Sequence, residues 1–320
     1  KKAEGYLSEI FGEGNVPPML RTIVKPPEGW VMMEADFCQA ELFTLANLSG
    51  DPNMLSALTT PGKDLHDKTA VDAFRLTMLD EHDNVVTEDM LVQMAADLID
   101  KGGAESEEFS SFMKHLRYRD TKGNIMTRDA FKSGIRVSAK SLNFGIPYGR
   151  GSKNISLQIK AETGTTQDLS QLEVEVQEMI NSWKTTTFPV AWEYLTTQQQ
   201  KVYNPGYIAN VWGRRKYAHI RQGEQRADLE REFANYNIQS TVADTMQIAL
   251  HLVDKLRKER GLKFKIQNQI HDAIMLELPE EEIEACKQIM HETMGGIQIP
   301  TGRGGTFTLG VDIDLYSRWG

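Results

Sequence analysis

Blocks of apolar and polar residues along the chain predict strands near its two ends and helices between them. A buried strand is predicted from Gly29 to Glu34 after a Pro26-Pro27 turn, with Asp36 at its end. A helix should follow from Glu41 to Leu48. Further helices are predicted over 129–148, twice within 168–200, and over 225–258, where apolar residues recur at helical spacing.

The last part of the chain predicts a β-hairpin. Two apolar runs, 263–270 and 273–278, bracket His271 and Asp272, so the turn presents Asp272. A helix over 280–294 and a closing strand over 306–315 complete an α+β pattern.

The segment 75–128 differs from its surroundings because it is polar and rich in charge. Loop residues punctuate helical pieces there, and we expect an inserted surface subdomain. No internal repeat is expected in the chain.

Composition indicates a globular protein. The chain has 320 residues, 40% of them hydrophobic, so it can bury a large core as one large domain or two interleaved ones. It has no apolar run of about 18 residues and no secretory signal at its start, so we expect a soluble intracellular protein that contacts no membrane. Cys38 and Cys286 have no ligand-like spacing, which fits a reducing compartment and argues against zinc.

The net charge of −9 argues against a protein that coats nucleic acid by charge alone, because phosphate neutralisation supplies most non-specific affinity. Any DNA contact should therefore be local. Basic residues gather within 136–160 and at 214–216. Taken alone, each group is more simply explained as a solvated charged face.

Two aspartates at strand ends, Asp36 and Asp272, are far apart in sequence but meet if their strands are neighbours in one antiparallel sheet. Mg²⁺ prefers oxygen ligands and keeps several waters, so two carboxylates and substrate phosphates suffice to bind it. A pair of such ions, about 3.5–4 Å apart, activates an attacking hydroxyl and neutralises a leaving oxygen. As isolated residues, the two aspartates are more simply explained as turn caps.

Arg136, Lys140, Phe144 and Tyr148 recur at every fourth position, which on a helix forms a slanting stripe on one side. Two cations suit a triphosphate, and two flat rings suit a sugar or base. Spacing alone favours an ordinary amphipathic helix with aromatic core contacts.

The order of these segments resembles the family A DNA polymerases. Asp36-Phe-Cys-Gln-Ala-Glu-Leu resembles the family's first motif, Arg136 to Gly149 its second, and Gln269-Ile-His-Asp-Ala its third. Between them, 64–70, 213–217 and 231–241 also match in the expected order. The likeness runs from about Arg21 to the end of the chain, and several ordered motifs are far more specific than one.

The resemblance implies an α+β right-hand polymerase fold, with helical fingers inserted into an antiparallel palm sheet. Residues 1–60 and 225–320 would form the palm, and 61–224 the fingers, including the polar insertion at 75–128. The implied cofactor is Mg²⁺, as two ions for which Mn²⁺ can substitute. The implied partners are primer-template DNA and dNTPs, in the cytoplasm of a bacterial or phage-infected cell. The family's thumb and exonuclease-like domain would lie upstream and are expected to be missing from this chain.

The resemblance also assigns roles to individual residues. Asp36 and Asp272 would bind the metal ions and, with Lys140, be catalytic. Nucleotide binding would involve Arg136 and Lys140 on the triphosphate, Phe144 on the sugar, Tyr148 beside the templating pair, Glu41 against C2′, and Gln39 and His66. The DNA would be contacted by Arg231, Asn235 and Gln239 in the minor groove, His271 at the primer end, and Arg214 and Arg215.

Three departures from the family pattern stand out. Ala273 occupies the place of a second acidic residue after Asp272. Pro147 falls inside the second motif, where it should bend or end the helix before Tyr148. The interval from Asp64 to Lys140 is long, which assigns the extra residues to the insertion.

Two other functions fit part of the pattern. A single-subunit RNA polymerase shares the metal chemistry, but Phe144 and Glu41 favour DNA, because such enzymes are expected to have Tyr at the first position and to lack the second. A catalytically inactive primer-template binding module fits Ala273 and the missing thumb, but Asp36 and Asp272 argue against it. The unusual motif variants suggest a bacteriophage source.

Overall fold

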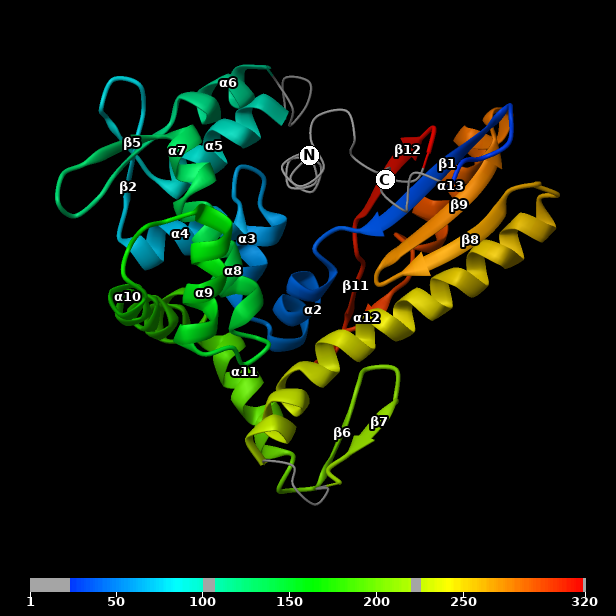
Figure 1. The fold of residues 1–320 in the computed structure, drawn as a ribbon. Coiled ribbons are helices and arrows are strands. Elements are labelled where there is room, and N and C mark those ends of the chain that lie inside the picture. Colours follow the sequence, from blue (N-terminus) through cyan, green and yellow to red (C-terminus); the bar gives the residue numbers. More distant parts are fainter. Residues whose placement is uncertain (1–23, 100–106, 220–225, 319–320) are drawn as a thin grey trace, which may run out of the picture. The chain divides into compact units, whose positions relative to one another are not determined.

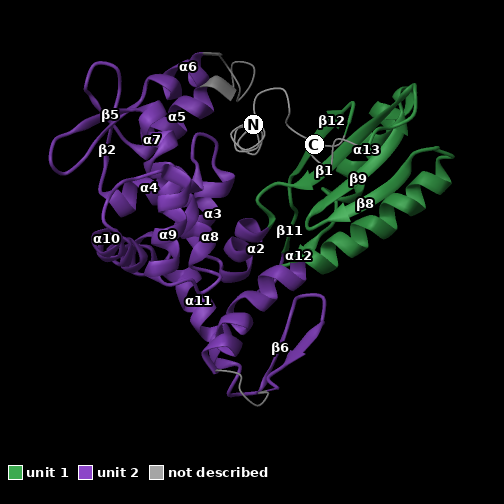
Figure 2. Ribbon diagram, viewed as in Figure 1, with its two compact units in different colours: residues 1–40, 242–300, 306–320 green, residues 41–241, 301–305 purple. Residues whose placement is uncertain are grey.

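The computed structural model describes residues 24–99, 107–219 and 226–318. The chain divides into two compact units (Figure 2). Unit 1 combines 1–40, 242–300 and 306–320, so it joins the two ends of the sequence, whereas unit 2 contains 41–241 and 301–305. The mixture of helices and antiparallel sheets confirms the α+β class (Figure 1). Among the described residues, no helix has both the length and the apolar character needed to span a bilayer.

Unit 1 is built on a four-stranded antiparallel sheet with the strand order β12-β1-β9-β8. The inner strand β9 is buried on both faces, as its nearly continuous apolar sequence predicts. The sheet strands are β1 (Trp30–Phe37), β8 (Lys265–Ile270), β9 (Ala273–Pro279) and β12 (Val311–Tyr316). The remaining elements are a 3₁₀ turn (Glu280–Glu282), α13 (Ile283–Thr293), β10 (Ile299–Pro300) and β11 (Thr306–Phe307).

The closing strand predicted over 306–315 is in fact two strands. β11 pairs with β10, whereas β12 pairs with β1. The break lies at Gly310, whose carbonyl accepts a hydrogen bond from the Cys38 backbone N–H at 2.9 Å. A Cβ at Gly310 would lie 3.1 Å from the Cys38 Sγ, so another residue there would require Cys38 to move by a few tenths of an ångström.

The long helix predicted over 225–258 is confirmed as α12 (Arg226–Glu259), with 34 residues. Apolar side chains at helical spacing, including Phe233, Ile238, Met246 and Val253, are buried along it. The division between the two units falls within this helix, between residues 241 and 242.

Unit 2 has a helical core. Trp183 and Phe188 are fully buried in it, with their rings edge to face and their centroids 5.4 Å apart. Its helices are α2 (Ala40–Ser49), α3 (Pro52–Thr59), α4 (Leu65–Phe74), α8 (Ile135–Gly145), α9 (Ser152–Thr163), α10 (Leu169–Ser182) and α11 (Pro189–Gln200). A π turn (Trp183–Thr187) separates the two helices predicted within 168–200, and a hairpin of β6 (Tyr207–Ala209) and β7 (Arg215–Tyr217) follows α11.

The single helix predicted over 129–148 differs from the structure at two points, of which only the first was unexpected. It is broken at Gly134 into α7 (Arg128–Ser133) and α8, because Gly134 leaves the helical conformation with φ −115° and ψ −80°. It also ends at Gly145, as Pro147 predicts. The four-residue stripe therefore runs on a helix only from Arg136 to Phe144, and Tyr148 lies in the following turn.

The predicted insertion contains a sheet that the sequence analysis missed. It is antiparallel with the strand order β3-β2-β4-β5. Its elements are β2 (Thr77–Leu79), β3 (Val85–Val86), α5 (Glu88–Ile99), α6 (Glu107–His115), β4 (Arg117–Arg119) and β5 (Ile125–Thr127). Strands of two or three residues are too short to show an alternating pattern.

This subdomain is an internal duplication of a β-hairpin and a helix, since residues 76–91 recur as 116–131. Leucine, aspartate, asparagine, threonine and aspartate occupy positions 76, 80, 84, 87 and 89 of the first copy and 116, 120, 124, 127 and 129 of the second. In both loops the aspartate side chain accepts the asparagine backbone N–H at 2.9 Å. The residue before the asparagine has a positive φ in both copies. The expectation of no internal repeat is therefore wrong; the identities are too few to stand out in the sequence.

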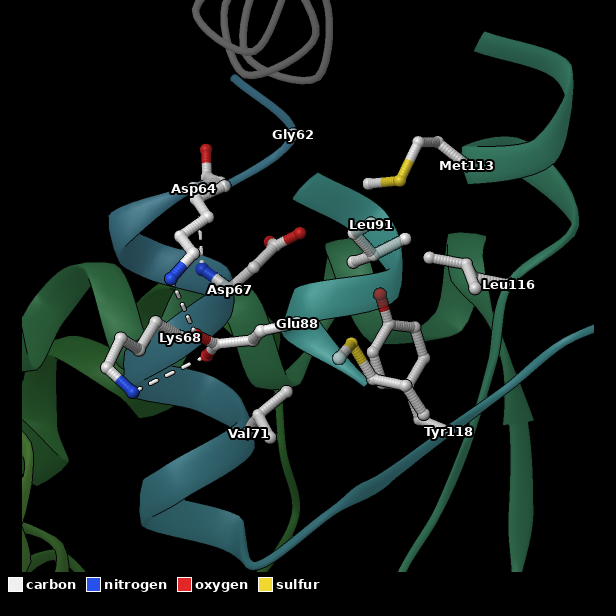
Figure 3. Close-up of a pocket in the computed structure, with 12 residues that line it drawn as sticks. Gly62, Asp64, Asp67, Lys68, Val71, Glu88, Leu91, Met113, Leu116 and Tyr118 are labelled. Carbon is white, nitrogen blue, oxygen red and sulfur yellow. Dashed lines mark hydrogen bonds and ion pairs between the residues drawn. The ribbon is translucent and has the colours of Figure 1, made fainter. Parts of the chain in front are cut away.

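Each copy contacts α4 through the residue that begins its helix. In the first copy, the Glu88 carboxylate lies 3.3 Å from the Lys63 Nζ and 3.4 Å from the Lys68 Nζ. In the second copy, the Arg128 Nη2 lies 2.5 Å from the Asp67 Oδ2. Figure 3 shows Asp67 and Lys68 on α4 beside Glu88. The two copies of this duplicated subdomain, 76–131, therefore bind adjacent residues of α4. The first copy binds Lys68 with a carboxylate, and the second binds Asp67 with a guanidinium.

Candidate active site

Unit 1 brings Asp36 and Asp272 together. Asp36 is paired with Ala273 across β1 and β9, and the Phe37 backbone N–H donates to the Asp272 carbonyl at 3.2 Å. Asp36 near the end of β1 thus lies beside the turn residue Asp272 that directly precedes β9, as the sequence predicts. The residue directly after Asp272 is the buried Ala273, so it adds no second carboxylate beside Asp272.

Like charges are concentrated around this pair. Across β1 and β12, Asp36 lies directly opposite Asp312, and Glu34 lies directly opposite Asp314. Like charges that face each other across a sheet repel and are unfavourable. Burial, followed by the charge of Asp272 and then that of Glu34, raises the pKa of Asp36 to about 6. A divalent cation would relieve this repulsion.

The donor set fits Mg²⁺ better than a fully protein-coordinated metal. Within 24–99, 107–219 and 226–318, no group of three or more His, Cys, Asp or Glu residues is arranged as a metal cluster. Two carboxylates leave most coordination positions for water and substrate oxygens, as Mg²⁺ prefers.

Two predicted site residues in unit 1 adopt a left-handed backbone. Gln39, directly after β1, has a φ of 46°, and His271, in the turn between β8 and β9, has a φ of 53°. Both side chains are exposed. Such conformations are uncommon outside glycine and cluster at functional sites. The His271 turn is held by the Gln269 Nε2, which donates to the His271 carbonyl at 2.7 Å.

In unit 2, Arg136 is engaged by two carboxylates of the α4 segment. Its Nη2 lies 2.8 Å from the Asp64 Oδ2, and its Nε lies 2.8 Å from the Asp67 Oδ1. Burial raises the pKa of Asp64, but the Asp67 backbone N–H and the Arg136 guanidinium outweigh it, so the pKa is lowered. The sequence analysis missed both carboxylates, although they belong to the segment 64–70.

Lys140 and Phe144 lie one and two turns after Arg136 on α8. Lys140 is exposed, whereas Phe144 is half-buried with its ring centroid 5.9 Å from that of His66. His66 itself is only 5% exposed. Burial lowers its pKa to about 4, with Arg136 and Lys140 adding to that effect and Asp64 opposing it. His66 is therefore neutral near pH 7.

Asn143 determines the tautomer of His66. Its Oδ1 accepts from the Trp183 Nε1 at 2.9 Å, so its Nδ2 must donate to the His66 Nδ1, also at 2.9 Å. The His66 proton is then on Nε2. This ring can act on a substrate only as a neutral donor.

Glu41, Tyr148 and Gln239 form a second polar cluster in unit 2. The Tyr148 hydroxyl donates to the Glu41 Oε1 and accepts from the Gln239 Nε2 at 3.0 Å. Burial and the bond to Glu41 raise the pKa of Tyr148 to about 12, so the phenol stays protonated. Glu41, Tyr148, Phe144 and Asn235 line one narrow recess.

The part of α12 in unit 2 carries Arg231, Asn235 and Gln239 at spacings of four, so they lie on one side of the helix. With Tyr148 they line a groove of about 570 Å³. The buried Asn235 Oδ1 has no hydrogen-bond partner among the described residues. A Cβ at Gly149 would lie 2.6 Å from Arg231, so this glycine leaves the space for the Arg231 stem.

Arg214 and Arg215 are both exposed on the hairpin of β6 and β7. The Arg215 guanidinium lies 5.3 Å from the centre of the Tyr207 ring. A cation beside an aromatic ring on an exposed hairpin suits a nucleic-acid strand.

The chain matches a known family over most of its length. The model of "DNA polymerase family A" matches residues 10–87 and 119–320. Residues 88–118, inside the duplicated subdomain, are left unmatched.

Similar curated proteins include DNA polymerase I of Geobacillus stearothermophilus, at 28% identity over 83% of this chain and 24% of the relative. DNA polymerase I of Caldicellulosiruptor bescii is 26% identical over 86% of this chain and 26% of the relative. The thermostable DNA polymerase I of Thermus aquaticus is 25% identical over 84% of this chain and 25% of the relative. The chain therefore spans about a quarter of the length of these relatives.

A solved structure, the POL domain of Pol1 from M. smegmatis in complex with DNA primer-template and dNTP, has the same fold. It superposes with a TM-score of 0.63 at 23% identity, over 94% of this chain and 42% of that chain. This likeness shows the fold, whereas the family is shown by the family match, which covers β1, β9 and α8. The chain belongs to DNA polymerase family A.

Proposed function

We propose that this chain is the catalytic part of a template-directed DNA polymerase, which adds deoxynucleotides to a primer 3′-hydroxyl and releases pyrophosphate. The observation that carries this proposal is that Asp36 on β1 lies beside Asp272, in the turn before β9, in a member of DNA polymerase family A. A cluster of carboxylates in which the pKa of Asp36 is raised to about 6 suits divalent cations.

Asp36 and Asp272 would hold two Mg²⁺ ions, for which Mn²⁺ can substitute. Bound there, the ions supply activation of the primer hydroxyl and neutralisation of the leaving oxygen. The His271 turn would steady the primer end, and Gln39 would contact the nucleotide from the turn after β1; their strained backbones fit such roles.

Residues of unit 2 would bind the nucleotide. Arg136 and Lys140 place two cations on one face of α8, which suits a triphosphate, and Phe144 would lie against its sugar. His66 would donate from its neutral Nε2 to a phosphate oxygen.

Glu41 and Tyr148 would act as a pair, because the Tyr148 hydroxyl donates to the Glu41 carboxylate. Glu41 would exclude the ribose 2′-hydroxyl and Tyr148 would abut the templating pair.

The DNA would be read by the groove along α12. Arg231 and Gln239 offer donors, which the acceptor-rich minor groove requires, and Asn235 lies between them in the lining of the same groove. Arg214 and Arg215 would contact the strand backbone.

In this assignment, 1–60 and 225–320 are palm and 61–224 are fingers, with an insertion at about 75–128. Thumb and exonuclease-like functions would come from other parts of the protein, and the reaction would take place in the cytoplasm.

Primer extension tests the proposal. The protein should extend a 5′-labelled primer on a DNA template with dNTPs and Mg²⁺, but much less with NTPs. A preference for NTPs would indicate an RNA polymerase. Tight primer-template binding without extension, with Mg²⁺ or Mn²⁺, would indicate an inactive binding module.

A further inference from the structure

Two carboxylates already bind Arg136, so a triphosphate would compete with them for its guanidinium. Its guanidinium is held by Asp64 and Asp67, each at 2.8 Å. The two carboxylates are not equally able to release it. Asp64 also caps α4, since its Oδ1 accepts the Asp67 backbone N–H at 2.8 Å, and its side chain is 36% exposed. The Asp67 side chain is only 13% exposed, so its negative charge depends more on nearby cations than the charge of Asp64 does.

A second arginine, Arg128, also forms an ion pair with Asp67. The Arg128 Nη2 lies 2.5 Å from the Asp67 Oδ2, while Arg136 occupies Oδ1. Burial raises the pKa of Asp67, and Arg128 opposes this shift. If Arg136 turned away, Arg128 would still neutralise this buried carboxylate. Without Arg128, Asp67 would keep Arg136 as its closest cation.

The duplicated subdomain holds Arg128 in place. The Arg128 side chain is 7% exposed, and its Nη1 donates to the hydroxyl of Tyr118 in β4. The Tyr118 ring stacks on Phe131 at 3.8 Å between centroids, and the Arg128 guanidinium lies 5.2 Å from the centre of the Phe131 ring. Tyr118 lies within 88–118, the part that the family match leaves out, and lines the same pocket as Asp67 (Figure 3).

We propose that Arg128 is a positioning residue, which retains Asp67 when Arg136 exchanges its carboxylates for the triphosphate of an incoming nucleotide. Tyr118 gives the duplicated subdomain a role in nucleotide binding, because it fixes Arg128. This inference rests on the proposed role of Arg136 as a triphosphate ligand.

The test measures dTTP binding by calorimetry, independently of catalysis, alongside single-nucleotide insertion. Arg128→Met should weaken dTTP binding roughly tenfold, the effect of one charge-assisted hydrogen bond, and raise KM for all four dNTPs with little change in kcat. Arg128→Lys should restore part of the loss. In Asp67→Asn/Arg128→Met, the competing carboxylate is gone, so dTTP binding should return toward the wild-type value.

Glu88→Gln is the matched control, because Glu88 begins the equivalent helix of the other copy and contacts α4 through Lys63 and Lys68 instead of Asp67. It should leave dTTP binding unchanged. Equal weakening by Glu88→Gln and Arg128→Met, or no recovery in the double variant, would show that Arg128 only supports α4 and would overturn the proposal.

If Arg128→Met does not fold, Tyr118→Phe decides the question, since it keeps the ring stack and removes only the hydroxyl. It should weaken dTTP binding several-fold, and unchanged binding would overturn the proposal. A wild-type protein that binds dTTP but extends no primer would refute the polymerase function and leave the positioning role standing. A wild-type protein that binds no dTTP would refute the positioning role.

Discussion

At the scale of single residues, mutation can separate two functions of Glu41, its hydrogen bond to Tyr148 and its proposed exclusion of the ribose 2′-hydroxyl. Its carboxylate accepts from the Tyr148 hydroxyl, and it is the residue proposed to exclude the ribose 2′-hydroxyl. Glu41→Ala should lower the preference for dATP over rATP roughly tenfold or more, because it opens space for the extra hydroxyl.

Tyr148→Phe distinguishes direct exclusion from positioning, because it removes the hydrogen bond and leaves the carboxylate. We expect it to retain most of the discrimination. If Tyr148→Phe loses as much as Glu41→Ala, Glu41 acts only by orienting Tyr148, and an unchanged preference in both would remove Glu41 from sugar selection. Single-nucleotide extension with each substrate gives these ratios.

His66 makes a residue-scale contribution to the pH dependence of stability. Its pKa is about 4 in the folded chain, against 6.5 as the ordinary value. Between these values the unfolded state binds more protons, so this contribution is present above pH 6.5 and is lost as the pH falls toward 4. The loss amounts to about 3 kcal/mol.

His66→Gln keeps an acceptor for Asn143 but cannot be protonated. Its free energy of unfolding should therefore fall less than that of the wild type between pH 6.5 and 4, as measured by denaturant titration at each pH. Parallel curves for the two proteins would show that His66 is not held neutral in the fold.

Several residues that organise the site received no role from the sequence. Arg136 was identified by its spacing, but its partners Asp64, Asp67 and Arg128 depend on how α4, α7 and α8 pack. Chemistry at one position can be inferred from residue type, whereas ion-pair partners from distant segments require the fold.

At the scale of elements, helix α2 is completed by a residue from the far end of the sequence. Its last turn contains no basic residue. The Arg303 Nη2 donates to the Asn47 carbonyl there at 2.7 Å, and the Arg303 guanidinium covers Gly50, whose φ is 71°. A cation at this end of a helix is favourable by about 0.3–1 kcal/mol.

Gly50→Ala should therefore destabilise the protein by about 1–3 kcal/mol, since it strains the backbone and displaces Arg303. A Cβ there would lie 1.9 Å from the Arg303 Nη1. In an Arg303→Ala background the same substitution should cost less, because only the backbone strain remains. Equal costs in both backgrounds, measured by chemical denaturation, would show that Arg303 does not cap α2.

Elements with a long periodic pattern were predicted well, and short ones were not. α12 and the hairpin of β8 and β9 have enough residues for their apolar spacing to be unambiguous. The break at Gly134 was missed because a lone glycine is tolerated within many helices. The two copies of the duplicated subdomain were missed because their strands are very short and their likeness lies mainly in turn residues.

At the scale of the whole molecule, the discontinuity of unit 1 was partly foreseen. The expected pairing of strands from the two ends of the chain is confirmed, since β1 lies between β9 and β12. That pairing could be predicted only through Asp36 and Asp272 and the family resemblance. Nothing in the local pattern of β1 specifies a partner more than 200 residues away.

The most direct measurement of the central claim is single-turnover dNTP incorporation by Asp36→Asn and Asp272→Asn in Mg²⁺. Each should incorporate roughly 1,000-fold more slowly or worse, because it removes charge from the proposed metal site, while primer-template affinity stays near the wild-type value. Asp254→Asn is the matched control, an aspartate of α12 whose carboxylate is paired with Arg257 and Lys258, and should incorporate at the wild-type rate. If either of the first two variants folds normally and incorporates at the wild-type rate, the assignment of Asp36 and Asp272 as the catalytic metal ligands is wrong.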